Sequence, residues 1–302
     1  MKTSEIAMDL IPHKKRRVEL PFILPSIIII SILFITPILF TILASFTDFR
    51  IGDRMNEVQW IGMENYARLF NGLQSNFGYS VWISLLMTVL GTVIQMVLGL
   101  LSAMVINRDF RLKSLVIACL IVPVAMTPSI ASQMWKLMFN ADFGIINYIT
   151  DSLFHFRITW LNADNAFLSC MIATVWQYTP QVTLMMYAGL CSLPTAPYES
   201  AKIDGANSVQ LFFQITLPLL KPLLLLCALL RTVDMLKTFD IPYTLTQGGP
   251  GSATKFLGLL IYDIAVGDTN YVGRACAIAV ILLLIVCSIS LLLFKALNKN
   301  RA

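Results

Sequence analysis

The chain has 302 residues, of which 57% are hydrophobic and 13% are charged, and its formal net charge at pH 7 is +5. Soluble globular chains carry about 25% charged residues because water must wet their surface, so this composition excludes most soluble architectures. It also excludes intrinsic disorder, and with no basic stripe beyond His13 to Arg17 we expect no nucleic-acid partner. Lipid is therefore the expected solvent of much of the chain.

The first apolar segment lies between Glu19 and Asp48 and contains no charged residue. About 20 apolar residues cross the hydrocarbon core of a bilayer, whereas the apolar centre of a cleavable signal peptide has roughly 7 to 15. We therefore predict a cytoplasmic basic tail at 1–19 and a retained transmembrane helix at 20–47, kinked at Pro37.

Further apolar runs follow an external segment predicted at 48–78. Four of them are free of charge and cover residues 79–107, 114–135, 165–198 and 275–294. A fifth run contains Lys221 and leads into a charged stretch, and we expect its helix to begin near Pro218 or Pro222 and to end near Thr246. The sequence thus predicts an all-α, polytopic membrane protein with six transmembrane helices, five of them in a core at 79–297, before a short tail at 298–302.

Lysine and arginine beside short loops indicate the cytoplasmic side of a membrane protein. They gather at three places in this chain, namely Lys14 to Arg17, Arg108 to Lys113, and Lys295 to Arg301. With six spans, both termini, the second loop and the fourth loop are predicted to be cytoplasmic.

Residue types that carry soluble-enzyme chemistry are scarce. The six cysteines fall inside apolar runs without a C-x-x-C pair, and the two histidines are far apart in the sequence, so we expect no disulfide framework, metal site or catalytic triad. The stretch Gly251 to Lys255 lacks the residue order of a phosphate-binding P-loop.

The fourth loop, residues 193–222, has the pattern of a helix, a break and a second helix. Pro197 to Ile203 favours a short helix, Gly205 allows a turn, and Asn207 with Gln210 fits a capping box. The second helix has an apolar face formed by Val209, Phe212, Phe213 and Thr216. Such a face must pack on the chain itself, on another protein or on the bilayer surface, and these alternatives remain open from the pattern alone.

This loop resembles the E-A-A, three residues, glycine, nine residues, I-x-L-P loop of binding-protein-dependent ABC importer permeases. The matching residues are Glu199, Ser200, Ala201, Gly205, Ile215, Leu217 and Pro218, with Ser200 where the family usually has alanine. Three more segments, Trp60 to Phe70, Trp135 to Asn147 and Thr244 to Thr254, extend the resemblance to nearly the whole chain. They are similar to maltose-type and glycerol-phosphate-type sugar permeases, and the first helix is similar to that of the first subunit of such a pair.

The resemblance implies an ABC type I importer permease fold in a bacterial inner membrane. It also implies four kinds of partner: a second homologous permease, two ATP-binding subunits that use ATP and Mg²⁺, an external substrate-binding protein, and a carbohydrate. The chain itself is expected to be non-catalytic and to bind no cofactor. Residues expected to couple it to the ATPase are Glu199, Ser200, Ala201, Asp204, Gly205, Phe212, Phe213, Ile215, Leu217 and Pro218.

A ladder of charges of alternating sign, Arg231, Asp234, Lys237 and Asp240, lies in predicted helix five. Charges at mid-membrane are costly, so they should face the transport pathway or the partner permease rather than lipid. The family places substrate on this helix and the preceding one, and the candidate pathway residues are Thr174, Gln177, Tyr178, Gln181, Arg231, Asp234, Lys237 and Thr238. Two structural readings stay open, namely paired charges near the outer interface and polar contacts between helices.

The leading prediction is a permease subunit of an ATP-driven carbohydrate importer. The same machinery for a polyol phosphate or another small polar solute is the first alternative. A secondary transporter, in which the intramembrane acids carry protons, gives no role to the patterned fourth loop. An integral-membrane enzyme lacks convergent histidine, aspartate or cysteine groups.

Overall fold

The computed structural model describes residues 16–54, 56–71, 76–267 and 269–299. Most of the predicted basic tail at 1–19 and the last residues of the tail at 298–302 lie outside the described residues. The described part is helical, with an isolated β-bridge between Thr47 and Trp60 as its β-structure. The elements are α1 (Arg16–Ile30), η1 (Ser31–Ile35), α2 (Thr36–Ala44), α3 (Glu64–Phe70), α4 (Phe77–Ile106), α5 (Lys113–Ala125), α6 (Pro128–Met138), α7 (Ile145–Phe154), α8 (Ala166–Cys191), α9 (Ala196–Ile203), α10 (Ser208–Leu211), η2 (Phe212–Thr216), α11 (Leu217–Leu236), α12 (Asp240–Thr246), α13 (Leu257–Val266) and α14 (Val272–Lys299).

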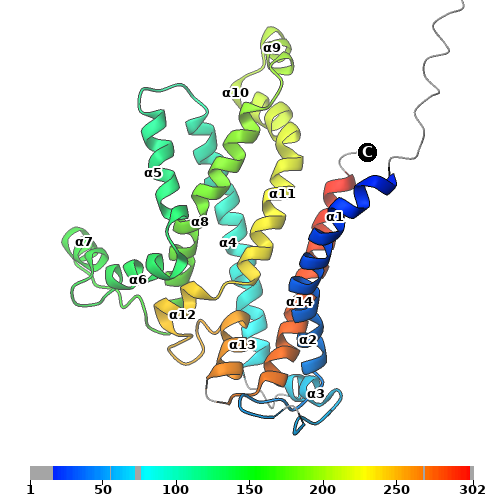
Figure 1. Ribbon diagram of the computed structural model, residues 1–302. Helices are drawn as coiled ribbons and strands as arrows, with labels where there is room; N and C mark the ends of the chain where they lie inside the picture. The colour runs from blue at the N-terminus through cyan, green and yellow to red at the C-terminus, as the bar shows by residue number, and fades with distance from the viewer. Residues whose placement is uncertain (1–15, 55, 72–75, 268, 300–302) are drawn as a thin grey trace, which may run out of the picture.

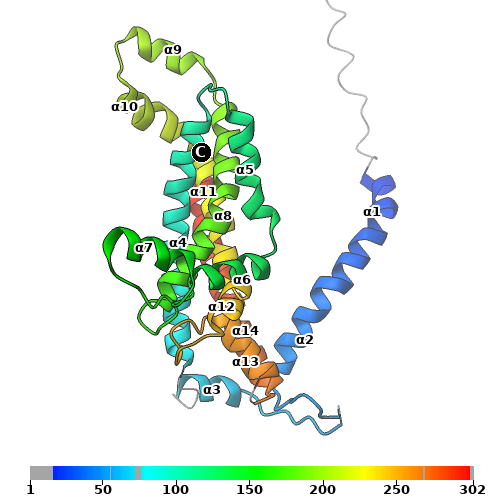
Figure 2. The same ribbon diagram turned by 90° about the vertical axis from the view of Figure 1, so that its left-hand side faces the viewer.

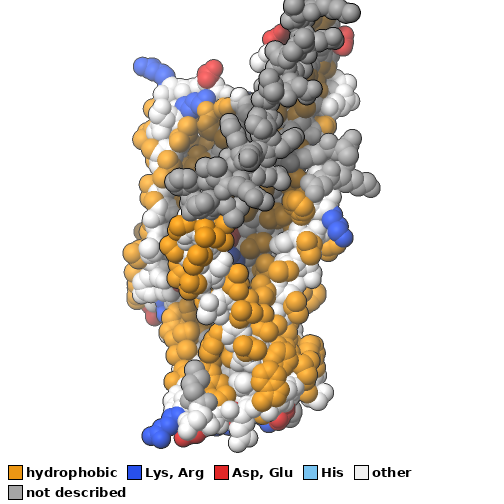
Figure 3. Space-filling model, turned by 45° about the vertical axis from the view of Figure 1, so that its right-hand side comes forward, with side chains coloured by type: hydrophobic (Ala, Val, Ile, Leu, Met, Phe, Trp, Pro, Cys, Tyr) orange, Lys and Arg blue, Asp and Glu red, His pale blue; other side chains and the backbone are white. Residues whose placement is uncertain are grey.

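Four helices of the described chain are long and apolar enough to cross a membrane. They are Ile23–Ala44, Phe77–Ile106, Ser208–Leu236 and Val272–Leu297, and the bent pair α5 and α6 supplies a fifth candidate. Helix α8 is long enough to span, but side chains such as Gln177 and Gln181 make it more polar than these helices. The all-α prediction is confirmed, whereas six spans remains a prediction. Apolar side chains cover much of the lateral face in Figure 3.

The third predicted span, at 114–135, is bent and does not form one continuous helix. Helices α5 and α6 meet at an angle of 99°, and Met126 and Thr127 between them are extended. Proline disfavours the helical conformation of the residue before it, so Pro128 explains why Thr127 leaves the helix. Helix α6 therefore runs across the bundle instead of along it (Figures 1 and 2).

The fifth helix also ends earlier than predicted. Helix α11 stops at Leu236, and α12 begins at Asp240, after a short non-helical stretch, in place of one helix continuing to Thr246. Lys237 and Phe239 have non-helical backbone angles. The break places the last two charges of the ladder at helix ends, where they can turn toward water and one another rather than toward lipid.

Helices α4 and α8 form the central packed pair of the bundle, with α11 against both (Figure 1). The pair approaches closely at Gly99, where an added Cβ would lie 2.6 Å from Val182 Cγ1. A second packed cluster joins α13 to α14 through Leu257, Leu260 and Ile278. Helix α2 runs along part of α14, whereas α1 leans away from the other helices in Figure 2.

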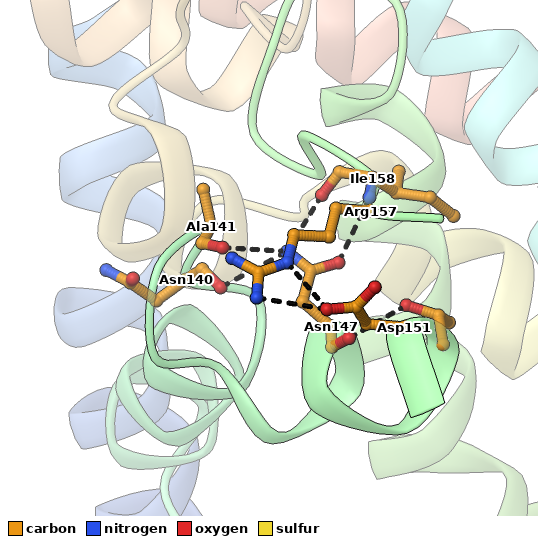
Figure 4. Close-up of polar contacts among 7 residues, drawn as sticks. Asn140, Ala141, Asn147, Asp151, Arg157 and Ile158 are labelled. Carbon is orange, nitrogen blue, oxygen red and sulfur yellow. Dashed lines mark hydrogen bonds and ion pairs between the residues drawn. The ribbon is translucent and has the colours of Figure 1, made fainter. Parts of the chain in front are cut away.

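Two asparagines in the segments that carry the family resemblance, Asn65 and Asn147, hold loops in place. Asn65 donates from Nδ2 to the carbonyls of Ser45 and Thr47, which fixes the end of α2 against α3. Asn147 holds the loop after α7 by donating to Ile158 O and accepting from Ile158 N (Figure 4). The contact between α2 and α3 lies at the opposite end of the molecule from α9, whereas α7 lies to one side, partway along the bundle, and the start of α1 and the end of α14 lie toward the α9 end (Figure 1).

Candidate functional site

A cavity of about 380 Å³ lies where α8, α11 and α12 meet the break between α5 and α6. We call it the polar cavity. Its lining residues are Pro128, Tyr178, Arg231, Asp234, Lys237, Thr238, Phe239, Asp240 and Ile241. Five of the predicted pathway residues therefore come together here, from two helices and the stretch that follows α11.

Arg231 is the buried centre of this wall, with 2% of its surface exposed. Its Nε donates to Gln95 Oε1 at 2.9 Å, its Nη1 lies 3.4 Å from Asp234 Oδ2, and its guanidinium carbon lies 4.5 Å from the ring centroid of Tyr178. A buried charge is tolerated only when it is paired and hydrogen-bonded, and these three contacts provide that. The Arg231 side chain is therefore held in one place.

The depth of Arg231 follows from its contact with α4. Gln95 is eleven residues from Ile106, the end of α4, which corresponds to about 16 Å along a helix. The hydrocarbon core of a bilayer is about 30 Å thick, so a helix that crosses it with Ile106 at one boundary carries this contact near the middle. A charge at such a depth is too costly to face lipid.

The charges around the cavity balance. Asp234 is half-exposed and lies 3.4 Å from Arg231 and 3.7 Å from Lys237 Nζ. With Asp240 also on the wall, the lining holds two cations and two carboxylates. Aromatic rings of Tyr178 and Phe239 complete it. Such a wall offers donors, acceptors and apolar faces without a net charge, which suits an uncharged polyhydroxylated molecule better than a strong anion.

Three other predicted pathway residues lie away from this cavity. Thr174 is buried, and its hydroxyl donates to Cys170 O within α8. Gln177 is buried and donates from Nε2 to Met126 O at 3.1 Å, which satisfies a carbonyl freed by the helix break. Gln181 is half-buried and does not line the cavity. The first two make contacts that hold the structure together.

The sequence reasoning missed Gln95, which supports Arg231 directly. Its Nε2 also donates to Thr174 O at 3.1 Å, so one amide joins α4, α8 and α11. A signal existed, because a glutamine in the middle of an otherwise apolar span needs a buried partner. Asp240 was predicted only as a member of the charge ladder, and Phe239 and Ile241 were missed as wall residues because the helix was predicted to continue through them.

The fourth loop forms the second candidate region, at the other end of α11. Helix α9 matches the predicted short helix, Gly205 has φ +81°, and Asn207 and Gln210 form both hydrogen bonds of a capping box. Only glycine adopts such a φ readily, so the predicted turn is confirmed.

Most of the residues predicted to meet the ATPase are accessible. Glu199, Ser200, Asp204, Gly205, Phe213 and Pro218 are exposed, whereas Ala201, Phe212, Ile215 and Leu217 are half-buried. Ile203, with 87% of its surface exposed, is a further apolar side chain at the tip. Phe212 and Phe213 meet edge to face at 5.0 Å, and the exposed ring is that of Phe213.

A π-helical turn, η2, joins α10 to α11 and was not predicted. It ends two residues before Pro218, as the other π turn, η1, ends two residues before Pro37. A proline ring crowds the preceding turn and lacks a backbone donor, and a wider turn relieves both problems. Pro123, Pro180 and Pro222 lie inside helices without such a turn before them, so proline positions alone do not predict it.

Comparison with protein families decides the class of this molecule. The profile of the family described as "Binding-protein-dependent transport system inner membrane component" matches residues 95–302. The chain belongs to this family. This family membership identifies the chain as an inner-membrane component of a transport system.

Two relatives from this family match the chain over most of their length. The trehalose/maltose transport system permease protein MalF of Thermococcus litoralis is 33% identical over 94% of each chain. The sulfoquinovosyl glycerol transport system permease protein SmoG of Agrobacterium fabrum is 31% identical over 85% of this chain and 83% of its own.

Solved structures show the same fold. A chain of a bacterial ABC transporter involved in import of the acidic polysaccharide alginate matches with a TM-score of 0.81 and 19% identity, covering 93% of this chain and 95% of that one. The expected importer permease fold is thereby confirmed. The roles of individual residues are a separate question.

Proposed function

We propose that this chain is the membrane-spanning, non-catalytic permease subunit of an ATP-driven importer that moves a carbohydrate delivered by an external binding protein. The observation that carries the proposal is the placement of two regions on one element. Helix α11 starts at the exposed, capped fourth loop and ends at the charge-balanced polar cavity, with Arg231 buried in its wall. Relatives named for trehalose, maltose and sulfoquinovosyl glycerol transport support a carbohydrate as the cargo.

The partners follow from the same two regions. We assign the fourth loop, centred on Glu199 and Gly205, to the contact with an ATP-binding subunit, which uses ATP and Mg²⁺ in place of any cofactor on this chain. A second permease completes the pathway, since Asp234 and Lys237 on the wall of the polar cavity are half-exposed in a single chain. A structurally similar alginate transporter is described in complex with a substrate-bound periplasmic protein, which supports delivery from outside.

The polar cavity acts by binding and releasing its cargo without covalent chemistry. Asp234 and Lys237 are half-exposed and can exchange their mutual ion pair for hydroxyl groups, whereas Arg231 stays fixed by Gln95 and Tyr178. Fixed donors preorganise the site, and mobile ones let the cargo leave. Phe239 and Tyr178 offer ring faces for the C–H side of a sugar.

Uptake into proteoliposomes tests this proposal. The complex with its permease and ATPase partners is reconstituted, the binding protein is added outside, and labelled trehalose, maltose and glycerol 3-phosphate are supplied in turn. We expect uptake of a sugar only with internal ATP and Mg²⁺ and only with the binding protein. Uptake that follows a proton or sodium gradient without ATP would contradict it, and uptake of glycerol 3-phosphate alone would replace the cargo with a polyol phosphate.

A further inference from the structure

Helix α9 has little packing behind it. A cavity of about 480 Å³ lies between α9 and the cytoplasmic-side ends of α4 and α8, lined among others by Arg108, Leu190, Tyr198, Glu199 and Lys202. No residue of α9 is fully buried. If a partner protein displaced α9, the helix would move into this space unless a contact with the rest of the chain prevented it.

One side-chain hydrogen bond links α9 to η2, the turn that leads into α11, in the part of the chain that the structure describes. The Tyr198 hydroxyl donates to Thr216 Oγ1 at 3.0 Å, and that hydroxyl donates in turn to Leu211 O at 3.2 Å. Thr216 is 9% exposed, so the link is shielded from water on its α11 side. Shielding strengthens a hydrogen bond and makes its loss costly.

The acceptor of this bond lies where the fourth loop joins α11. Thr216 is the last residue of η2, and the next residue begins α11. The threonine also satisfies Leu211 O, a carbonyl five residues earlier in the widened π turn, so the same side chain stabilises that turn. From Thr216 to Arg231 is fifteen residues, or about 22 Å along one continuous helix.

From these contacts we infer that Tyr198 is a positioning residue that acts as a strut. Its hydrogen bond to Thr216 keeps α9 from moving into the 480 Å³ cavity behind it and transmits a displacement of α9 to α11 and so to the polar cavity. Without the strut, α9 moves into the space behind it and α11 receives less of the displacement. The inference rests on the proposed coupling through the fourth loop. It adds a residue and a contact to which the family's loop motif, at Glu199 to Pro218, assigns nothing.

The test compares coupling ratios, the substrate transported per ATP hydrolysed, in the reconstituted complex. Tyr198→Phe and Thr216→Val each remove the bond, Thr216→Ser keeps the hydroxyl, and Tyr148→Phe makes the same change on the exposed surface of α7. Because a net hydrogen bond corresponds to a factor of about 3 to 10, we expect the ratio to fall by that factor in the first two variants and to stay unchanged in the others. The double variant should match either single one.

A purely structural role predicts a different result. It would lower the melting temperature of the complex without changing the coupling ratio, and that outcome overturns the inference. Equal defects in Thr216→Ser and Thr216→Val would overturn it as well. Hydrogen exchange of residues 196–206 in the assembled complex gives a substrate-independent reading, in which Tyr198→Phe should speed exchange by about the same factor of 3 to 10. If Tyr198→Phe speeds exchange but the wild-type complex shows no ATP-coupled uptake, the proposed function fails and the transmission role fails with it, while the Tyr198–Thr216 contact is confirmed.

Discussion

The polar cavity and the fourth loop are opposite in construction although they share one helix. At the cavity, Arg231 is buried and held by Gln95, Asp234 and Tyr178, which come from three helices. At the loop, the side chains are exposed, and stiffness comes from the backbone through a glycine turn and a capping box. The cavity thus depends on tertiary contacts, whereas the loop depends on local ones, and substitutions in the two regions should fail differently.

The largest effect is expected at Gly205, where a substitution distinguishes the shape of the fourth loop from backbone strain in general. Gly205→Val places a β-branched residue at φ +81°, and Gly52→Val does the same at φ +102° in an external loop, with no atom within 4 Å of either added Cβ. Strain of about 1–3 kcal/mol is expected at both positions. We expect Gly205→Val to reduce ATP hydrolysis stimulated by the binding protein to the basal rate and Gly52→Val to leave it intact. Equal loss in both would show that strain alone matters.

The next effect tests the charges of the polar cavity. Asp234→Asn removes the half-exposed carboxylate that bridges Arg231 and Lys237. The matched control is Asp151→Asn, which removes a similarly exposed carboxylate of α7 that pairs with Arg157 (Figure 4). Charged hydrogen bonds contribute about 1.5–3 kcal/mol, so sugar uptake should fall about tenfold or more in the first variant only. Assembly should be normal in both. Loss of assembly in Asp234→Asn would assign the ladder to structure.

A third substitution sharpens the boundary of the cavity. Gln177→Ala removes the donor to Met126 O at the break between α5 and α6. Leaving this part-buried carbonyl without its partner costs about 1–3 kcal/mol, so thermal unfolding of the complex should occur at lower temperature. Substrate preference should not change. Altered preference with full thermal stability would place Gln177 on the pathway after all.

The smallest effect concerns the capping box. Asn207→Ala removes the acceptor for Gln210 N and costs about 1 kcal/mol of local helix stability. Stimulated ATP hydrolysis should fall about twofold, because the second helix of the loop frays without losing the Gly205 turn. Asn162→Ala, which removes the acceptor for Asn165 N before α8, is the matched control and should leave the rate unchanged. If Asn207→Ala reduced stimulated ATP hydrolysis more than Gly205→Val, the capping box would matter more to coupling than the glycine turn, contrary to this prediction.

Local features were the predictable ones. The short helix, the glycine turn and the capping box depend on neighbouring residues, so Pro197, Gly205 and Asn207 sufficed to place them. The family's wider fold was also predictable, since charge-free runs and several matching segments specify it together.

The polar cavity was only partly predictable because its members meet through tertiary packing. The ladder's spacing of three predicted the Arg231 to Asp234 contact, but nothing local showed that Gln95 would reach it. Helical spacing on α8 put Gln177 and Tyr178 in one set, although they point to different surroundings. Pro128 itself indicates the break before it, but the span at 114–135 was predicted from its lack of charge alone, which carries no information on bending.

The most direct test of the two-region account is the ATP hydrolysis rate of the whole complex in lipid nanodiscs, measured with and without the binding protein loaded with trehalose or maltose. We expect a rise with the loaded protein in wild type, none in Gly205→Val, and in Asp234→Asn a rise that requires higher concentrations of the loaded protein. A rate that ignores the loaded binding protein in wild type, or a Gly205→Val complex that responds normally, would contradict the claim that α11 links an external sugar site to a cytoplasmic ATPase.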